Sequence, residues 1–185
     1  MLLPERTGLT RDDLDAFPDD GLRRELIDGE LFVSARPALR HQMVMAELVW
    51  TLVSYCKQHG GLAVTEPNND YSPRDHIEPD LVVVRADHRD RLSARGIEGA
   101  PDVVVEISSP STRGYDLVRK RAFYEREGVA EYWFVDLDED VVIVHRLHDG
   151  AYGMPVFFAR GATLTSPVLP GLAADVDALL GPVRP

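Results

Sequence analysis

The sequence predicts an α/β domain of three layers, in which a sheet carries a helix on each face. Residues 80–84 and 103–108 are rich in valine and short, which is typical of buried strands. Apolar residues recur at helical spacing over residues 38–59 and again over residues 114–127. The expected order over residues 38–136 is helix, strand, strand, strand, helix, strand, which combines an antiparallel meander with one crossover.

The N-terminal part is predicted to add a short helix and a β-hairpin to this core. Thr10-Arg11-Asp12-Asp13 has the pattern of a capping box and predicts a helix that ends near Phe17. Residues 22–27 and 30–34 are strand-like runs, and Asp28-Gly29 lies between them. An Asp-Gly pair between two such runs is a strong signal for a two-residue hairpin turn.

The long helix of the core is expected to run from about Ala38 to His59, and Gly60-Gly61 ends it. Its apolar residues are interpreted as core packing; they are Met43, Ala46, Val49, Trp50, Val53 and Cys56. A strand is expected at residues 62–66, and residues 85–101 are expected to form a long polar connection.

The second helix is expected to end at Gly128 and to lead into a strand over residues 131–136. Further strands are predicted at 141–147 and 152–159, with a weak helix at 175–180. We therefore expect a single domain, divided as follows: 1–185 overall, core about 38–136, N-terminal helix and hairpin 10–34, C-terminal extension 141–185.

Composition excludes several classes of protein. The 185 residues are 44% hydrophobic and 28% charged, which is ordinary for a globular domain and excludes a disordered chain. No apolar run is long enough to cross a membrane, and the single cysteine, Cys56, allows no internal disulfide. We expect a cytoplasmic protein. The net charge of −11 counts against extensive nucleic-acid contacts unless basic residues gather locally.

Two acidic residues occupy positions that would bring them together. Asp80 begins one valine-rich strand, and Glu106 lies near the end of the next. If these strands are antiparallel neighbours, the two carboxylates lie side by side and repel each other unless a cation or a proton separates them. A hard cation such as Mg²⁺ would resolve this conflict, while two solvated carboxylates at strand ends are the alternative.

Lys120 is one of only two lysines, and helical spacing places it beside Phe123 and Tyr124 on the apolar side of the second helix. A buried lysine could orient a water molecule or stabilise charge on a phosphate. The alternative is a lysine whose stem is buried and whose head pairs with Asp116 at i,i+4.

The segment from 113 to 126 contains five basic and two acidic residues. Arg113, Arg119 and Arg121 are therefore candidates for a basic rim that binds nucleic acid, although an ordinary solvated helix surface has the same pattern.

Several stretches resemble a known family. Glu78-Pro79-Asp80 and Val105-Glu106-Ile107-Ser108 resemble the PD-(D/E)XK nuclease superfamily. Arg24-Glu25-Leu26-Ile27-Asp28-Gly29-Glu30-Leu31 and the stretch from Glu106 through Asp116, Lys120 and Tyr124 to Asp136 resemble the Uma-type family of restriction-endonuclease-like proteins. The resemblance covers roughly residues 10–172. It implies a restriction-endonuclease-like αβββαβ core.

The resemblance also implies a metal-dependent endonuclease whose expected substrate is DNA. Asp80 and Glu106, with the main-chain carbonyl of Ile107, would hold Mg²⁺ or Mn²⁺, and Lys120 would orient the attacking water or neutralise the transition state. The remaining residues that match or adjoin the family pattern are Glu25, His41, Ser108, Asp116 and Tyr124. Glu25 would complete the acidic site and His41 opens the long helix, and for both a structural role is the alternative.

One departure from the superfamily pattern keeps a second hypothesis open. Ser108 stands where the pattern has lysine, two residues after the acid. The chain could therefore be a nuclease fold that no longer cuts and serves as a nucleic-acid or protein binding module. Exposed strand edges also make a homodimer an expectation.

Overall fold

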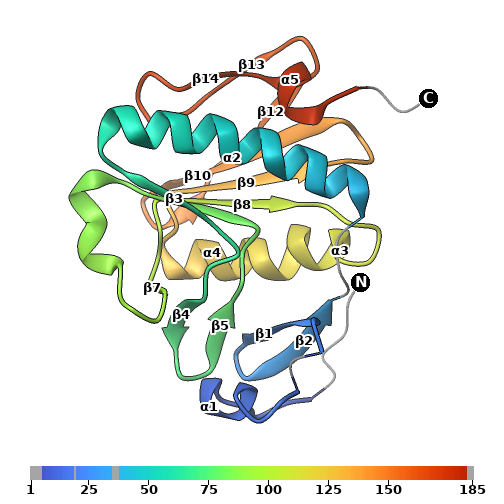
Figure 1. Cartoon of the computed structure of the whole chain (residues 1–185), viewed down its shortest axis with the longest axis vertical. Helices are drawn as coiled ribbons and strands as arrows, with labels where there is room; N and C mark the ends of the chain where they lie inside the picture. The colour runs from blue at the N-terminus through green and yellow to red at the C-terminus, as the bar shows by residue number, and fades with distance from the viewer. Residues whose placement is uncertain (1–5, 19, 35–37, 183–185) are drawn as a thin grey trace.

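A mixed sheet of seven strands forms the centre of the molecule (Figure 1). The computed structural model describes residues 6–18, 20–34 and 38–182, so the ends of the predicted domain, 1–5 and 183–185, lie outside it. The strand order is β11-β10-β9-β8-β6-β3, and β12 pairs with β10. The strands are β3 (Leu62–Thr65), β6 (Leu81–Val84), β8 (Val103–Ile107), β9 (Glu131–Asp136), β10 (Val141–His148), β11 (Ala151–Tyr152) and β12 (Val156–Ala159).

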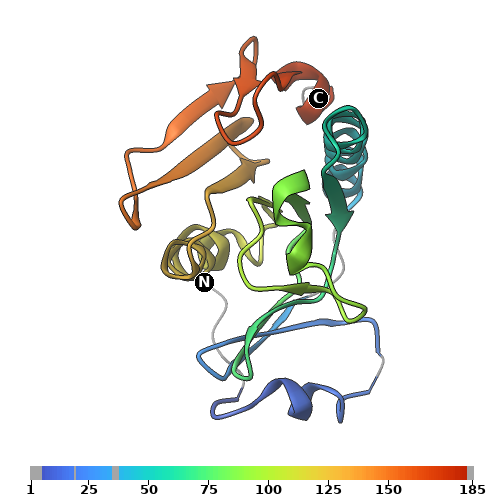
Figure 2. The ribbon, with the colours of Figure 1, turned by 90° about the vertical axis from the view of Figure 1, so that its left-hand side faces the viewer.

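One helix covers each face of this sheet, as Figure 2 shows. Helix α2 (Leu39–His59) packs on the face that carries Val83 and Val105. The opposite face, with Val82 and Val104, packs against the helix formed by α3 (Arg113–Tyr115), a π-helical turn η2 (Asp116–Lys120) and α4 (Arg121–Glu127). Successive side chains of a strand point to opposite faces, so each valine run supplies both cores. The predicted three layers are confirmed.

The predicted crossover is also present. Strands β6 and β8 are antiparallel, β8 and β9 are parallel, and the second helix connects β8 to β9. Gly128 ends α4 in a left-handed conformation. Glycine suits this position because a residue with a β-carbon would be strained there.

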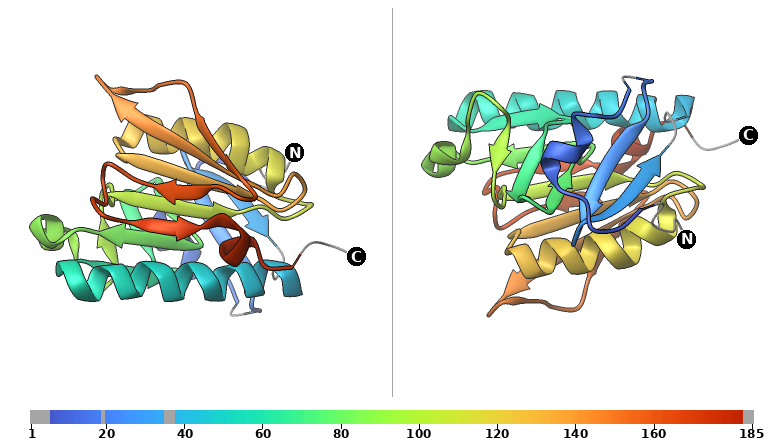
Figure 3. Two further views of the ribbon diagram at one scale, coloured as in Figure 1. Left: turned by 90° about the horizontal axis from the view of Figure 1, so that it is seen from above. Right: turned by 90° about the horizontal axis from the view of Figure 1, so that it is seen from below.

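A second sheet of five strands, which the sequence did not predict as a unit, lies beside the core with strand order β2-β1-β5-β4-β7 (Figure 3, right). The predicted hairpin forms β1 (Arg23–Ile27) and β2 (Glu30–Ser34), and Asp28 and Gly29 both have positive φ. The other strands are β4 (Asn69–Ser72), β5 (Asp75–Ile77) and β7 (Ile97–Glu98). Leu26 of β1 pairs with His76 of β5, which fixes the N-terminal hairpin to the core.

Several local predictions are wrong in detail. Helix α1 (Arg11–Leu14) is shorter than the predicted helix to Phe17, and the predicted strand at 152–159 is two strands, β11 and β12. The connection 85–101 contains a 3-10 helix, η1 (Ala86–Arg91), besides β7. Beyond β12, the C-terminal extension forms β13 (Thr163–Thr165), β14 (Ala173–Asp175) and α5 (Val176–Leu180), which Figure 3 (left) shows beside α2. Their apolar residues join the core between α2 and the central sheet.

The buried face of α2 also differs from the prediction. Val44, Leu48, Leu52 and Cys56 face the sheet, whereas Trp50 is 73% exposed and Met43 is also exposed. Apolar residues occur on two sides of this helix, so spacing alone did not decide which side is buried. Over the described residues, no helix is long and apolar enough to span a membrane.

Candidate active site

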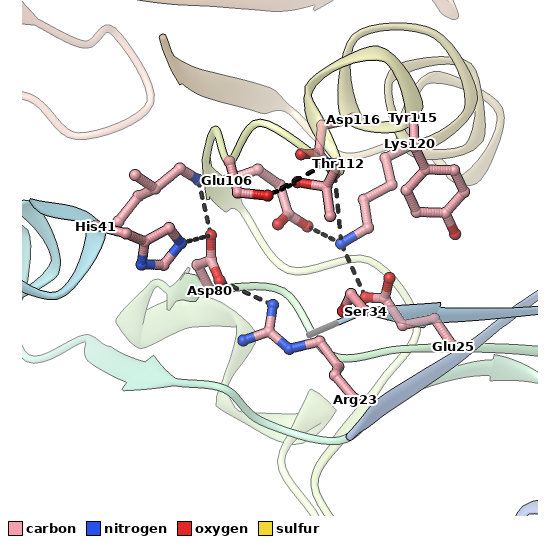
Figure 4. Close-up of a pocket in the computed structure, with 12 residues that line it drawn as sticks. Arg23, Glu25, Ser34, His41, Asp80, Glu106, Thr112, Tyr115, Asp116 and Lys120 are labelled. Atoms are coloured by element: carbon pink, nitrogen blue, oxygen red, sulfur yellow. Dashed lines mark hydrogen bonds and ion pairs between the residues drawn. The ribbon is translucent and has the colours of Figure 1, made fainter. Parts of the chain in front are cut away.

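Asp80 and Glu106 come together because their strands are antiparallel neighbours. Leu81 pairs with Val105, and the same register one step further along places Asp80 opposite Glu106. Both acids are 2% exposed. The amide of Ile107 donates a hydrogen bond to Asp80 Oδ2 at 2.7 Å, which links the two strand ends directly. The predicted juxtaposition of the two acids is confirmed (Figure 4).

Asp80 is surrounded by hydrogen-bond donors from three elements. Besides Ile107, His41 at the start of α2 lies with Nε2 3.1 Å from Oδ2, and Arg23 of β1 donates from Nη1 to Oδ1 at 2.8 Å. Burial alone would favour the protonated acid. The hydrogen bond from His41 and the charge of Arg23 outweigh burial and hold the pKa of Asp80 well below its usual range. Asp80 is therefore an anion at neutral pH.

Lys120 lies among acids, on the core-facing side of its helix as predicted. Its Nζ is 2.8 Å from Glu106 Oε1, 2.8 Å from Glu25 Oε1 and 3.9 Å from Asp116 Oδ1. Lys120 is 2% exposed, so its ammonium group is buried with the rest of the side chain. Asp116, the partner expected from i,i+4 spacing, is the most distant of its three acidic partners. Burial disfavours the ammonium, but Glu106, Glu25 and Asp116 outweigh it and raise the pKa of Lys120 above its usual value.

Glu106 is the most crowded of these acids. Both Lys120 Nζ and the Tyr124 hydroxyl, which donates at 2.7 Å, meet the same oxygen, Oε1. Burial, reinforced by the charges of Asp80 and Glu25 against that of Lys120, raises the pKa of Glu106 to about 7. Its environment therefore disfavours the bare carboxylate, and a nearby proton or divalent cation would relieve this.

The π-helical turn provides two of these side chains. Asp116 and Lys120 are its first and last residues, and the hydroxyl of Tyr132 donates to the Asp116 carbonyl at 3.1 Å. Burial raises the pKa of the Asp116 carboxyl well above its usual value. Such turns inside α-helices occur often at functional sites, because they shift the side chains that follow relative to a regular helix.

The N-terminal hairpin completes the site from the second sheet. Glu25 of β1 contacts Lys120 and accepts a hydrogen bond from the Glu78 amide at 3.1 Å. Arg23, two residues earlier on the same face of that strand, reaches Asp80. The sequence analysis did not select Arg23. Its spacing from Glu25 was the available signal, but only strand pairing shows that this face meets the acids.

The residues around the pocket suit a hard divalent cation by their chemistry. Asp80, Glu106, Glu25 and Asp116 bring four carboxyl groups to one pocket, whereas Arg23 and Lys120 bring two permanent cations. In the described part of the chain, no three His, Cys, Asp or Glu side chains are arranged as a ready ligand group. Mg²⁺ and Mn²⁺ prefer oxygen ligands, and the acids of this pocket outnumber its basic side chains. Asp80 and Glu106 could therefore hold such a cation if their present partners shifted.

Ser108 and the arginines of the predicted rim lie differently from the central residues. Ser108 is buried, and its hydroxyl accepts a hydrogen bond from the Leu137 amide at 2.8 Å, so it holds the chain after β9. Each arginine is paired with an acid: Arg113 with Asp136, Arg119 with Glu30 and Arg121 with Glu125. Contact with a phosphate would require these arginines to leave or share those partners.

Comparisons with known proteins identify the family and the fold of this chain. The family model Uma2, described as "Putative restriction endonuclease", matches residues 11–177. The chain belongs to the Uma2 family. A search of the curated proteins finds no match. Among solved structures, the Uma2 chain resembles a protein titled "putative nuclease belonging to DUF820" from Anabaena variabilis ATCC 29413, with a TM-score of 0.78, 22% identity, and 93% of this chain and 97% of that chain covered. The predicted restriction-endonuclease-like fold is therefore confirmed.

Proposed function

We propose that this Uma2 protein is a divalent-metal-dependent endonuclease that hydrolyses phosphodiester bonds in nucleic acid, with DNA as the first substrate to test. The observation that carries the proposal is the meeting of Asp80 and Glu106 at paired strand ends, with the ammonium of Lys120 2.8 Å from Glu106. Buried carboxylates crowded beside a buried lysine are costly for stability, and such arrangements cluster at functional sites.

Asp80, Glu106 and the main-chain carbonyl of Ile107 are the ligands that we propose for Mg²⁺ or Mn²⁺. Such a cation would act as a Lewis acid toward an oxygen of the scissile phosphate. Asp80 is already ionised, and Glu106 would exchange its proton for the cation. On Glu106 we propose Oε2 as the ligand atom, because Lys120 and Tyr124 both use Oε1.

Lys120 would act as a fixed positive charge. Its raised pKa keeps the ammonium protonated at neutral pH, so it donates hydrogen bonds and does not serve as a general base. From its position it could orient the attacking water or stabilise charge that develops on the phosphate. Glu25, Asp116 and Tyr124 would position Lys120 and Glu106, and His41 would position Asp80.

The test is a cleavage assay with Mg²⁺ and Mn²⁺ on single-stranded and double-stranded DNA. Wild type and Asp80→Asn are purified side by side, together with Asp149→Asn as a matched control. Asp149 is exposed and has a φ of +50°, which asparagine also adopts, so this control changes charge without touching the site. We expect Asp80→Asn to lose cleavage and Asp149→Asn to keep it. Equal cleavage by wild type and Asp80→Asn would contradict the proposal.

A binding module without catalysis is the second candidate function. It is favoured by the ion pairs that Arg23 and Lys120 already make with Asp80 and Glu106, which neutralise part of the acidic site without any metal. Titration calorimetry separates the two candidates. Binding of a DNA duplex without measurable binding of Mg²⁺ or Mn²⁺ would favour the module, whereas cation binding that Asp80→Asn abolishes would favour the endonuclease.

A further inference from the structure

We propose that Arg23 is an exchangeable counter-ion, which neutralises Asp80 in the metal-free protein, gives way to the divalent cation, and then binds a phosphate of the substrate. This inference rests on the proposed function and adds to it a residue that couples cation binding to substrate binding. It concerns the N-terminal hairpin, which lies outside the sheet that carries the two acids.

The Arg23 side chain reaches from β1 to two acids. Its guanidinium bridges two acids, donating from Nη1 to Asp80 Oδ1 at 2.8 Å and from Nη2 to Glu66 Oε1 at 2.6 Å (Figure 4 shows the contact with Asp80). Arg23 also lines the pocket with Glu106 and Lys120. A guanidinium has a planar fork of donors, so it can exchange a carboxylate for a phosphate oxygen without losing its geometry.

The two carboxylate oxygens of Asp80 have different partners. The Ile107 amide and His41 both meet Oδ2, and Arg23 meets Oδ1. The Ile107 amide is part of the strand backbone and cannot move away without breaking the sheet. Oδ1 is therefore the oxygen that a cation can most readily take, and Arg23 is the group that must move or share it.

Lys120 and Arg23, which both line the pocket, differ in how far they are exposed. The side chain of Lys120 is 3% exposed and lies among three acids. The side chain of Arg23 is 18% exposed, and its second partner, Glu66, is 55% exposed. Moving Arg23 would break an exposed pair with Glu66, which is weak, and a buried pair with Asp80, whose charge the incoming cation would compensate. Moving Lys120 would instead leave Glu25 and Glu106, both almost fully buried, without their counter-charge. Moving Arg23 therefore costs less than moving Lys120. Arg23 is the cation of this pocket that is built to exchange.

The consequence is a positive coupling between the metal and the nucleic acid. A phosphate that takes the guanidinium frees Asp80 for the cation, and a cation on Asp80 frees the guanidinium for the phosphate. Thermodynamic linkage makes the two effects equal in size, and coupling of this kind is commonly about 5-fold to 150-fold in affinity.

The first experiment measures Mn²⁺ binding by calorimetry, without any cleavage. Arg23→Gln is compared with wild type and with Arg24→Gln, which removes the same charge from the next residue of β1, where Arg24 pairs with Asp20 away from the site. We expect Arg23→Gln to bind Mn²⁺ at least about 5-fold more tightly than wild type, and Arg24→Gln to match wild type. Unchanged or weaker binding by Arg23→Gln would overturn the exchange.

Arg23→Lys is a conservative variant that keeps the positive charge, so it separates direct exchange at Asp80 from a long-range effect of charge. Lysine keeps the positive charge but is a shorter point charge that cannot bridge Asp80 and Glu66. We expect its Mn²⁺ affinity to fall between those of wild type and Arg23→Gln. If Arg23→Lys matches wild type while Arg23→Gln binds tightly, only net charge matters and direct exchange at Asp80 is overturned.

The second experiment repeats the Mn²⁺ titration with a 20-nucleotide phosphorothioate DNA, in single-stranded and double-stranded form. We expect this DNA to tighten Mn²⁺ binding by wild type and to have much less effect on Arg23→Gln. Equal tightening in both proteins, or none in wild type, would overturn the coupling. If wild type binds and cleaves in an Asp80-dependent way but Arg23 has no effect, only this inference fails. If wild type binds no cation, the proposed function fails as well.

Discussion

Two buried glutamates lie at opposite ends of one pair of parallel strands, and their surroundings differ sharply. Glu131 pairs in register with Val103 at the beginning of β8, whereas Glu106 lies near its end, opposite Phe134 of β9. Both carboxylates are almost fully buried. The difference between them lies in which groups each one meets.

Glu131 is fully supplied with donors. Trp133 Nε1 donates to Oε2 at 2.8 Å, the Ser166 hydroxyl donates to Oε2 at 2.7 Å, and Arg146 Nε donates to Oε1 at 2.9 Å. The bond from Ser166 links the segment between β13 and β14 to the central sheet. Glu106 instead shares one lysine with Glu25 and Asp116 and uses a single oxygen. Burial is therefore common to both acids, and crowding by other acids is what distinguishes Glu106 from Glu131.

The largest expected effect comes from exchanging the two glutamates for glutamine. Glu106→Gln should lower the rate of cleavage by roughly 10³-fold, because a metal ligand contributes several kcal/mol of transition-state stabilisation. Glu131→Gln should retain the wild-type rate per folded molecule. Rates are measured with Mn²⁺ at a temperature where both variants are folded. Similar losses in both variants would remove the functional distinction between these acids.

Lys120 provides the next largest effect. Lys120→Ala should lower the rate by roughly 10²–10³-fold, which is typical when a charge or donor that stabilises the transition state is lost. The other lysine, Lys57, is exposed on α2, and Lys57→Ala is the matched control with an unchanged rate. Mn²⁺ affinity, measured by calorimetry, should not fall in Lys120→Ala. Full activity of Lys120→Ala would exclude the role proposed for this residue.

For the free energy of unfolding, the larger loss is expected in Glu131→Gln and not in Glu106→Gln. Glu131→Gln should lower the free energy of unfolding by about 2 kcal/mol, since the Arg146 guanidinium loses its buried counter-charge. In a domain of this size, that loss corresponds to a decrease in Tm of roughly 4–8 °C. Glu106→Gln should unfold at or above the wild-type temperature without metal, because it removes an ionisable group from a crowded acidic site while Lys120 keeps Glu25 2.8 Å away as its counter-charge. Thermal unfolding followed by circular dichroism measures both.

The last expected effect is a dependence of stability on pH. Because the pKa of Glu106 is raised from 4.5 to about 7, the folded protein binds this proton more tightly than the unfolded chain does. The resulting stabilisation is complete below about pH 4.5 and is lost as the pH rises through about 7. The difference in Tm between metal-free wild type and Glu106→Gln should therefore change across this window. A constant difference from pH 4.5 to pH 7.5 would show that Glu106 has no raised pKa.

The sequence predicted the core elements well and the second sheet poorly. Valine-rich runs gave β6 and β8 because their burial on both faces leaves little choice of residue type. Strands β4 and β5 are rich in polar residues, such as Asn69 and Asp75, and were not predicted. Their strand conformation depends on pairing with β1 and with each other, which is a tertiary effect.

Within the site, the same division applies. Asp80 and Glu106 could be selected from the sequence because they adjoin valine-rich runs, and Lys120 because helical spacing places it beside Phe123 and Tyr124. Glu25 and His41 were selected only through the family resemblance, and Arg23 was not selected at all. Arg23 carries no local signal of burial or pairing, since its partners Asp80 and Glu66 are distant in sequence.

The αβββαβ order, the two acids at strand ends and a lysine on the inner side of a helix could all be predicted from the amino-acid sequence. These features follow from local periodicity, which each segment displays without its neighbours. Long-range packing sets which face of α2 is buried, which sheet holds the N-terminal hairpin, and which cation neutralises which acid. Those choices depend on contacts between segments far apart in the chain, such as Arg23 with Asp80 and Glu25 with Lys120.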